Sequence, residues 1–480
     1  MTSTAVRSRA NHIGPLVALP IVLLLWVLPF HSAAIAFFFG VLRTSMQATT
    51  ILASWKEGVA VILLTAVMMR AILTRGPGVE IAAPDVAITG LIALAMLFAL
   101  VENPIFGAEI PAKVALFGFR SSVFFMVLYY VGRGVPEIGE RSTYIKHLYR
   151  VAVVVALIGV LERIFVTPQM LVALGAAAYV NDFLGMTATT VNNDFGLPAN
   201  YWSVLGRVPV RRAGSVFLGG QAFAIPFLLL IPAATSWAFD PSRRLRVWTI
   251  LGYVVIWMGL LVTITRTTIL VCMLQVVIFF LMTRRPTRVV GTVLTAAAVF
   301  LAALILVPGL GSFVLATATF QTSSSYSHVN DWRRGLVAFF EVPWGHGLGS
   351  SDQVAVRFNR PALTADNVFL GYAVDLGALG LIGYLGVLLT LGFFSWRLFK
   401  TSPSPETRIV AATVFLTNLG IALNGTSSAP FNSVFLAYNF FILAGSAITA
   451  YQRKTTQAAV LRYQIPGTGD QVPESGYPGR

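Results

Sequence analysis

The sequence contains a single cysteine, Cys272, among 480 residues. One thiol cannot form an internal disulfide, and it cannot supply a cysteine-based metal site. Charged residues are also scarce, at 11% of the chain, whereas soluble domains have about a quarter. Hydrophobic residues make up 56%, and the mean hydropathy is +0.77. This composition excludes an ordinary soluble domain and indicates a membrane protein.

The hydrophobic residues lack the pattern of a transmembrane β-barrel, which has segments of about ten alternating residues. They form runs close to the roughly 20 residues that a helix needs to cross a bilayer. We therefore predict an all-α polytopic membrane protein with about twelve transmembrane helices. The expected spans are 13–30, 57–74, 84–101, 115–132, 148–166, 218–238, 247–264, 267–283, 289–308, 367–395, 409–425 and 431–451.

The formal net charge is +15, from 34 Lys and Arg against 19 Asp and Glu. Such an excess can indicate nucleic-acid binding, but here the basic residues concentrate in alternate loops between the spans. Basic residues favour cytoplasmic loops. An even number of spans then predicts that both termini lie in the cytoplasm and that the protein crosses the cytoplasmic membrane. The lipid bilayer is therefore the expected surrounding, and we expect no nucleic-acid partner.

We predict one polytopic domain over residues 1–451, with two long extracytoplasmic loops at 167–217 and 309–366. The shorter segment 31–56 contains an apolar stretch too short to span, which predicts a re-entrant or interfacial helix. The tail 452–480 is rich in glycine and proline near its end and is predicted to be cytoplasmic and disordered. The sequence shows no internal repeat of the kind found in inverted-repeat transporters.

Four arginines fall at the predicted extracytoplasmic ends of apolar spans, where a charge is costly unless it has a partner or a cavity. A guanidinium binds phosphate oxygens through paired hydrogen bonds and stays protonated. Several guanidinia at one face could therefore hold a diphosphate without a metal. Each could instead snorkel to the interface or pair with a helix end. These residues are Arg120, Arg211, Arg212 and Arg266.

The loop 309–366 concentrates ionisable residues between apolar spans. Within it, residues 330–340 carry apolar side chains at helical spacing, which predicts an amphipathic helix along the membrane surface. His328 and His346 are candidate general bases near neutral pH. Asp366, at the start of a span, is either a base or a helix N-cap. Because no HExxH-like spacing occurs, we expect no metal and no other cofactor.

Several segments together resemble the O-antigen ligase/polymerase family of bacterial envelope enzymes. The turn Thr265-Arg266-Thr267-Thr268 is similar to the family's Ser-Arg turn between spans. A loop helix from Arg333 onward leads into Pro-x-Gly-x-Gly-x-Gly, which ends at Gly349. Two further segments match in order and spacing, so that the resemblance covers about residues 200–395. They are Asp366-Asn367-x-x-Leu370 with Asp375-x-Gly377-x-x-Gly380-Leu381, and Arg212-x-Gly214-Ser215-x-Phe217.

The resemblance implies an extracytoplasmic glycosyltransferase whose donor is a glycan linked to polyprenyl diphosphate. It implies that arginines hold the diphosphate leaving group while a base deprotonates the acceptor hydroxyl for inverting attack. The base is then Asp366 or His328. The remaining roles fall to two sets of residues. The diphosphate candidates are Arg212 and Arg266, with Arg120 and Arg211 beside them, and the acceptor or loop supports are Arg333, His346 and Asn367.

Ligases of this family that transfer glycan onto lipid A core typically have His where this chain has Asp366. The Asp-Asn pair favours the polymerase branch, which joins repeat units into O-antigen or exopolysaccharide. One alternative is a ligase that transfers glycan to a lipid or protein acceptor. Another is a flippase or transporter of lipid-linked glycans, but that function needs charges along a central path through the bilayer. The expected partners are the lipid-linked donor, a glycan or lipid acceptor and other polysaccharide-assembly proteins.

Overall fold

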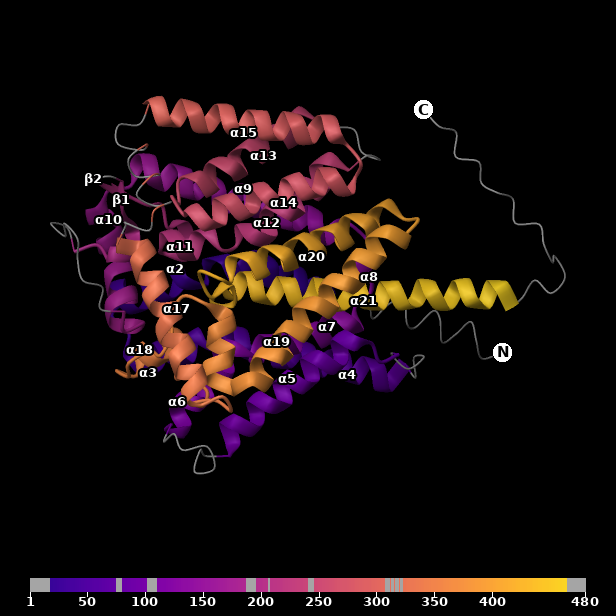
Figure 1. Ribbon diagram of the computed structural model, residues 1–480, viewed down its shortest axis with the longest axis horizontal. Helices are drawn as coiled ribbons and strands as arrows, with labels where there is room; N and C mark the ends of the chain where they lie inside the picture. The colour runs from indigo at the N-terminus through magenta and orange to yellow at the C-terminus, as the bar shows by residue number, and fades with distance from the viewer. Residues whose placement is uncertain are drawn as a thin grey trace.

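The fold is described from a computed structural model. The structure describes residues 18–74, 80–101, 110–186, 196–205, 208–240, 246–306, 311, 315, 319 and 323–463. Helices dominate this part of the chain, and the long ones run side by side along one axis (Figure 1). The only strands among the described residues are a short antiparallel pair, β1 (Trp202–Leu205) and β2 (Val208–Arg211). The structure confirms an all-α polytopic architecture.

The helical elements keep the labels of Figure 1, and short 3-10 or π segments are marked η. The first part of the chain contains η1 (Leu28–Phe30), α2 (His31–Ala36), η2 (Phe37–Val41), α3 (Met46–Ala53), α4 (Trp55–Thr74), α5 (Ala83–Leu100), α6 (Ala112–Ser122), η4 (Phe124–Val127), α7 (Leu128–Gly134), α8 (Glu137–Glu140), α9 (Thr143–Phe165), α10 (Pro168–Ala173) and η5 (Ala178–Phe183). The second part contains η6 (Ala199–Tyr201), η7 (Ser215–Phe217), α11 (Gly220–Ala224), α12 (Phe227–Phe239), α13 (Val247–Leu261), α14 (Arg266–Met282), α15 (Pro286–Leu306), α17 (Ser323–Glu341), α18 (Asp352–Arg357), α19 (Val368–Thr401), α20 (Pro405–Asn424), η8 (Pro430–Asn432) and α21 (Val434–Tyr463).

Each predicted span coincides with a helix or with consecutive helical segments. Seven described helices are long and apolar enough to cross a membrane, and the number is eight if a pair bent by 46°, α6 with η4 and α7, counts as one span. The other predicted spans correspond to α9, α13, α14 and α15. The seven are Ala18–Val41, Met46–Ile72, Ala83–Leu100, Gly220–Phe239, Val368–Thr401, Pro405–Asn424 and Val434–Arg453.

Several boundaries differ from the sequence-based expectation, and two of them change the interpretation of a segment. The apolar stretch after residue 31 is not a separate re-entrant helix, because Ala18–Val41 forms one continuous helical run. Helix α21 continues to Tyr463 and so enters the predicted 452–480 tail. A helix that extends beyond the apolar span has no signal in hydropathy, which ends where the polar residues begin. Residues 464–480 lie outside the described residues.

The centre of the bundle is formed by helices that are apolar nearly all round, a pattern typical of buried helices. Most of α12 is buried, and α12 packs against α9, α14 and α20. Small residues let other helices approach closely. A Cβ at Gly132 of α7 would lie 2.1 Å from the carbonyl oxygen of Ile442 in α21, so only glycine fits there.

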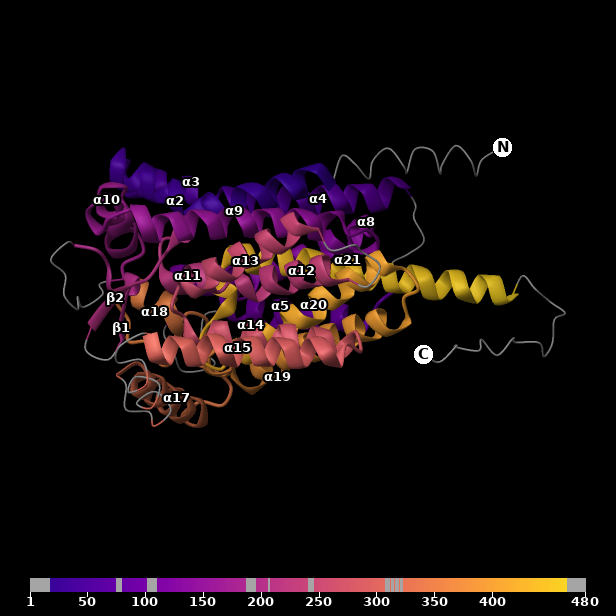
Figure 2. The same ribbon diagram turned by 90° about the horizontal axis from the view of Figure 1, so that it is seen from above.

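Short helices and the β1–β2 pair gather at one end of the bundle, while α21 extends from the opposite end (Figures 1 and 2). The first end therefore contains the described parts of both long loops. The predicted amphipathic helix of the second loop is confirmed as α17, which begins earlier than expected and runs across the bundle axis (Figure 1). Its apolar face is exposed, with Phe340 at 73%. Its position along the membrane surface stays a prediction.

Candidate functional site

The turn between α13 and α14 brings Arg212 and Arg266 together. The Arg212 guanidinium donates to the carbonyl oxygen of Thr263 at 2.8 Å and to the hydroxyl of Thr265 at 2.5 Å. Burial, together with the positive charge of Arg266, lowers the pKa of Arg212 to about 10. Arg212 therefore stays charged at neutral pH. An anion bound beside these two guanidinia would relieve the repulsion between them.

Arg211, in contrast, has a structural role. Its guanidinium donates to the carbonyl oxygens of Glu162 at 3.0 Å and Arg163 at 3.2 Å, which belong to the last turn of α9. The Glu162 carboxylate lies 4.0 Å from Arg211 and accepts hydrogen bonds from the backbone N–H groups of Gly214 and Ser215. Arg211 thus pairs with a helix end through Nη2, which is one of the alternatives that the sequence allows for each arginine.

The second long loop brings His328 and Asp366 together. Nδ1 of His328, on α17, lies 3.4 Å from Oδ2 of Asp366, just before α19. Both side chains are partly exposed, at 29% and 39%. Burial raises the pKa of Asp366, the positive charge of His328 opposes this shift, and the negative charge of Asp331 adds to it. Asp331 itself pairs with Arg334 one turn along α17. The two candidate bases therefore form one acid–base pair.

The N-cap of α19 is Asn367 and not Asp366. Oδ1 of Asn367 accepts hydrogen bonds from the backbone N–H groups of Phe369 at 3.0 Å and Leu370 at 3.1 Å. An Asn side chain satisfies these unpaired donors as well as an Asp does. The capping alternative for Asp366 is therefore wrong, and its carboxylate faces His328. Asn367 thus has a structural role at the start of α19, and its expected role in acceptor or loop support stays a prediction.

The glycine-rich turn after α17 fastens the loop to a bend in α19. Gly377 has a φ of 69°, which interrupts α19 and leaves carbonyl oxygens without helical partners. The backbone N–H of His346 donates to Val374 at 2.7 Å, and that of Gly347 donates to Asp375 at 3.0 Å. The two glycine motifs of the sequence thus bind each other.

His346 takes part in this fastening rather than in the acid–base pair. Its Nε2 lies 2.9 Å from the carbonyl oxygen of Ala338 in α17. Arg333, the other loop residue expected to support the acceptor, lies on the exposed face of α17 beside Val329 and Leu336. The structure therefore separates both residues from the pair formed by His328 and Asp366.

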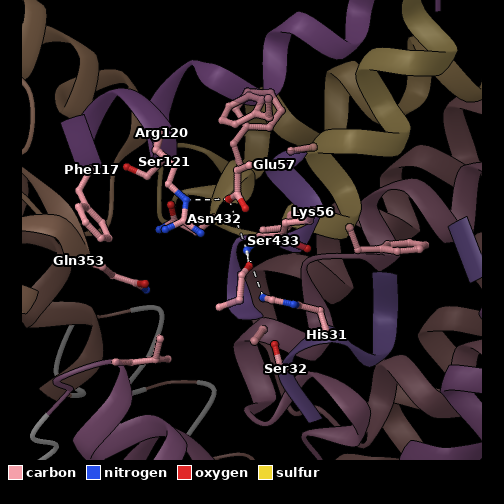
Figure 3. Close-up of a pocket in the computed structure, with 18 of the residues that line it drawn as sticks. His31, Ser32, Lys56, Glu57, Phe117, Arg120, Ser121, Gln353, Asn432 and Ser433 are labelled. Carbon is pink, nitrogen blue, oxygen red and sulfur yellow. Dashed lines mark hydrogen bonds and ion pairs between the residues drawn. The ribbon is translucent and has the colours of Figure 1, made fainter. Parts of the chain in front are cut away.

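A cavity of about 270 Å³ opens between α2, α4, α6, α18 and the turn before α21 (Figure 3). Arg120 lines it and donates from Nε to Oε1 of Glu57 at 2.7 Å. The same Glu57 oxygen lies 3.4 Å from Nζ of Lys56, and Nζ also donates to the carbonyl oxygen of Ala53 at 2.8 Å. Lys56 and Glu57 stand at the boundary of a predicted span, where charged residues are ordinary, so the sequence does not distinguish them as site residues.

Asp352 lies at the boundary between this cavity and a second one. It lines the cavity and a smaller neighbouring one that also contains Asn367. Its carboxylate accepts a hydrogen bond from the Asn432 amide at 2.6 Å. Burial raises the pKa of Asp352 to about 6, the hydrogen bond from Asn432 opposes this shift, and the negative charge of Asp366 adds to it. The charged loop identified in the sequence includes Asp352, but nothing in its spacing distinguishes this residue from its neighbours.

Residues 251–385 match the family model described as O-antigen ligase. The matched range contains Arg266, His328, Asp366 and the glycine-rich turn, whereas Arg120 and Arg212 lie outside it. No curated protein matches the chain. In the part of the chain that the structure describes, no three His, Cys, Asp or Glu side chains group as metal ligands. The match over residues 251–385 and the polytopic helical fold together support the resemblance of this chain to the O-antigen ligase/polymerase family.

Proposed function

We propose that the protein polymerises oligosaccharide repeat units carried on polyprenyl diphosphate, at the extracytoplasmic face of the cytoplasmic membrane. The observation that carries this proposal is the acid–base pair of His328 and Asp366, 3.4 Å apart, within the matched range. A proton acceptor of this kind is what glycosyl transfer to a hydroxyl group requires.

The arginine pair lies on elements that are joined to the acid–base pair by hydrogen bonds. Helix α14 begins at Arg266, and Thr268 in its first turn accepts a hydrogen bond from Asn424 at 3.1 Å. Gly425, which follows Asn424, accepts a hydrogen bond through its carbonyl oxygen from the backbone N–H of Val368 at 2.9 Å. Val368 is the first residue of α19. This connection supports a single reaction centre with a leaving-group side and an acceptor side.

In the proposed reaction, the acceptor hydroxyl oxygen attacks the anomeric carbon of the donor sugar from the face opposite the diphosphate. The bond from that carbon to the diphosphate oxygen breaks, and the oxygen leaves with the electron pair. Arg212 and Arg266 stabilise the charge that develops on the diphosphate, so no metal ion is needed. The hydroxyl proton passes to Nε2 of His328, while Asp366 on the Nδ1 side orients the ring and stabilises the imidazolium.

A ligase is the second candidate, because the matched family model is described as O-antigen ligase. The two functions differ in the acceptor and therefore in the product. The polymerase reading rests on Asp366, at a position where ligases that act on lipid A core typically have His. The clustering of the arginines at one end of the bundle argues against a flippase, which needs charges along its path.

Purified protein in lipid nanodiscs, supplied with a lipid-linked repeat unit, tests the proposal. We expect a ladder of products that differ by one repeat unit, with release of polyprenyl diphosphate. A single transfer to an added lipid or protein acceptor would instead identify a ligase. If the protein moves the lipid-linked unit across a vesicle membrane and forms no new glycosidic bond, the enzyme proposal is wrong.

A further inference from the structure

Three cationic side chains from three separate elements face the 270 Å³ cavity. They are Lys56 of α4, Arg120 of α6 and Arg357 of α18. The guanidinium groups of Arg120 and Arg357 both lie over the ring of Phe117, at 5.6 and 5.1 Å from its centre. Two arginines that share one aromatic ring are held close together, although like charges repel.

The negative charge beside these cations is smaller than the positive charge. Glu57 is shared between Lys56 and Arg120. Among the described residues, no carboxylate forms an ion pair with Arg357, which contacts Phe117 and, at 5.5 Å, Phe183. The carboxylate of Asp352 accepts its hydrogen bond from Asn432. The cavity of about 270 Å³ therefore has room for an anion and an excess of positive charge beside it.

This cation group is distinct from the Arg212–Arg266 pair, because α11 stands between them. A Cβ added at Gly220 would lie 2.4 Å from Nε of Arg212, so this side of α11 faces the arginine pair. Ala222, two residues further on, lines the cavity. Residues two apart on a helix point in nearly opposite directions, about 200° apart. The two cationic groups thus lie on different sides of one short helix.

We propose that the cavity formed by Lys56, Arg120 and Arg357 binds the diphosphate of a second lipid-linked glycan, the acceptor. The inference rests on the proposed polymerase function, in which both substrates are carried on polyprenyl diphosphate. The donor's diphosphate then binds to Arg212 and Arg266, and the acceptor's carrier remains intact on the other side of α11. Each guanidinium can donate two parallel hydrogen bonds to the oxygens of a diphosphate.

The polar walls of the cavity fit the glycan that is attached to this diphosphate. Gln353 and Asn432 place amide groups at the cavity (Figure 3), and amides both donate to and accept from sugar hydroxyls. Asp352 lies on the same wall and senses the charge of Asp366. A glycan attached to a diphosphate in the cavity would therefore meet polar side chains on this wall.

The test counts bound carriers. Wild-type protein in nanodiscs is titrated with polyprenyl diphosphate that has no sugar, and bound lipids are counted by native mass spectrometry. We expect two equivalents for the wild type and one for Arg357→Gln, which removes a cation without leaving a carboxylate unpaired. The Arg266→Gln variant should also bind only one equivalent of the lipid, because it disrupts the proposed donor site. The matched control is Lys113→Gln, on the same helix as Arg120 but outside the cavity lining, and it should retain two.

Several results would overturn the inference. The inference is wrong if the wild-type protein binds only one equivalent of polyprenyl diphosphate. It is also wrong if the Arg357→Gln and Lys56→Gln variants both still bind two equivalents. Inorganic pyrophosphate is the second probe, and an affinity equal to that of the lipid would argue against a carrier site. In turnover, we expect Arg357→Gln to raise the KM for the lipid-linked acceptor about tenfold or more, and to leave transfer to a soluble acceptor glycan unchanged. Polymerisation with only one bound carrier refutes this inference alone, whereas no consumption of donor refutes the proposed function.

Discussion

His328 and Asp366 meet at 3.4 Å, although one lies on a loop helix and the other at the mouth of a membrane helix. The contact depends on Asn367, which caps α19 and so releases the Asp366 carboxylate from that task. Neighbouring residues thus divide two roles, the local fold and the proposed chemistry.

The first prediction concerns this pair. His328→Gln removes the proposed base, and Asp366→Asn removes the carboxylate that orients it, so both should slow glycosyl transfer. Loss of a general base typically costs about 10²–10⁴-fold in rate. The measurement is the initial rate of repeat-unit addition, with donor binding measured in parallel. Full activity in both variants would show that the base lies elsewhere.

The second prediction separates two adjacent arginines. Arg212→Gln should lower the transfer rate about a hundredfold or more, because a donor to the leaving group is lost. Arg211→Gln should instead lower the thermal unfolding temperature, because it leaves Glu162 and the end of α9 without their partner. Rates and unfolding curves of both purified variants test this difference. The same stability loss in both, with no difference in rate, would contradict it.

The third prediction concerns pH. The proposed mechanism needs Asp366 ionised, so the rate should fall as the pH falls through its raised pKa. Asp331→Asn removes a negative charge that raises this pKa, and activity should then persist to lower pH. His328 and Asp352, the other titratable groups near Asp366, are unchanged in this variant. A pH–rate profile of both proteins checks the direction, and a shift of the acid limb to higher pH would be the wrong sign.

The fourth prediction concerns the bend in α19. Gly377→Ala should destabilise the protein by about 1–3 kcal/mol, because its positive φ is unfavourable for other residues. The new Cβ would also lie 2.4 Å from the backbone carbon of Trp344. The matched control is Gly386→Ala on the same helix, where the nearest atom is 3.8 Å away. Thermal unfolding in detergent should show a loss for the first variant only.

The membrane helices could be predicted from the sequence because apolar runs and bilayer thickness determine them directly. Arg212 and Arg266 could both be selected from motifs as diphosphate candidates, and this role stays a prediction. The acid–base pair was only half predictable. The sequence offers Asp366 and His328 as alternative bases, because spacing along the chain does not reveal that α17 folds back against α19.

The cavity could not be predicted. Lys56 and Glu57 begin a membrane span, and charged residues are ordinary at such boundaries. Their meeting with Arg120 and Arg357 depends on the tertiary packing of helices that are distant in sequence. Local patterns also could not tell Arg211 from Arg212, since only the end of α9, which arrives from another part of the chain, makes one of them structural.

The hydrogen bonds between the glycine-rich turn and the bend of α19 have a mechanical consequence. Val374 and Asp375 hold the turn on one side of Gly377, and Ala378 donates to Pro343 at 2.8 Å on the other. The glycine-rich turn is therefore hydrogen-bonded to α19 on both sides of the bend, so it cannot move independently of this helix. Any movement of the turn must therefore also tilt the part of α19 next to the bend, so motion of the extracytoplasmic loop is coupled to the tilt of a membrane helix.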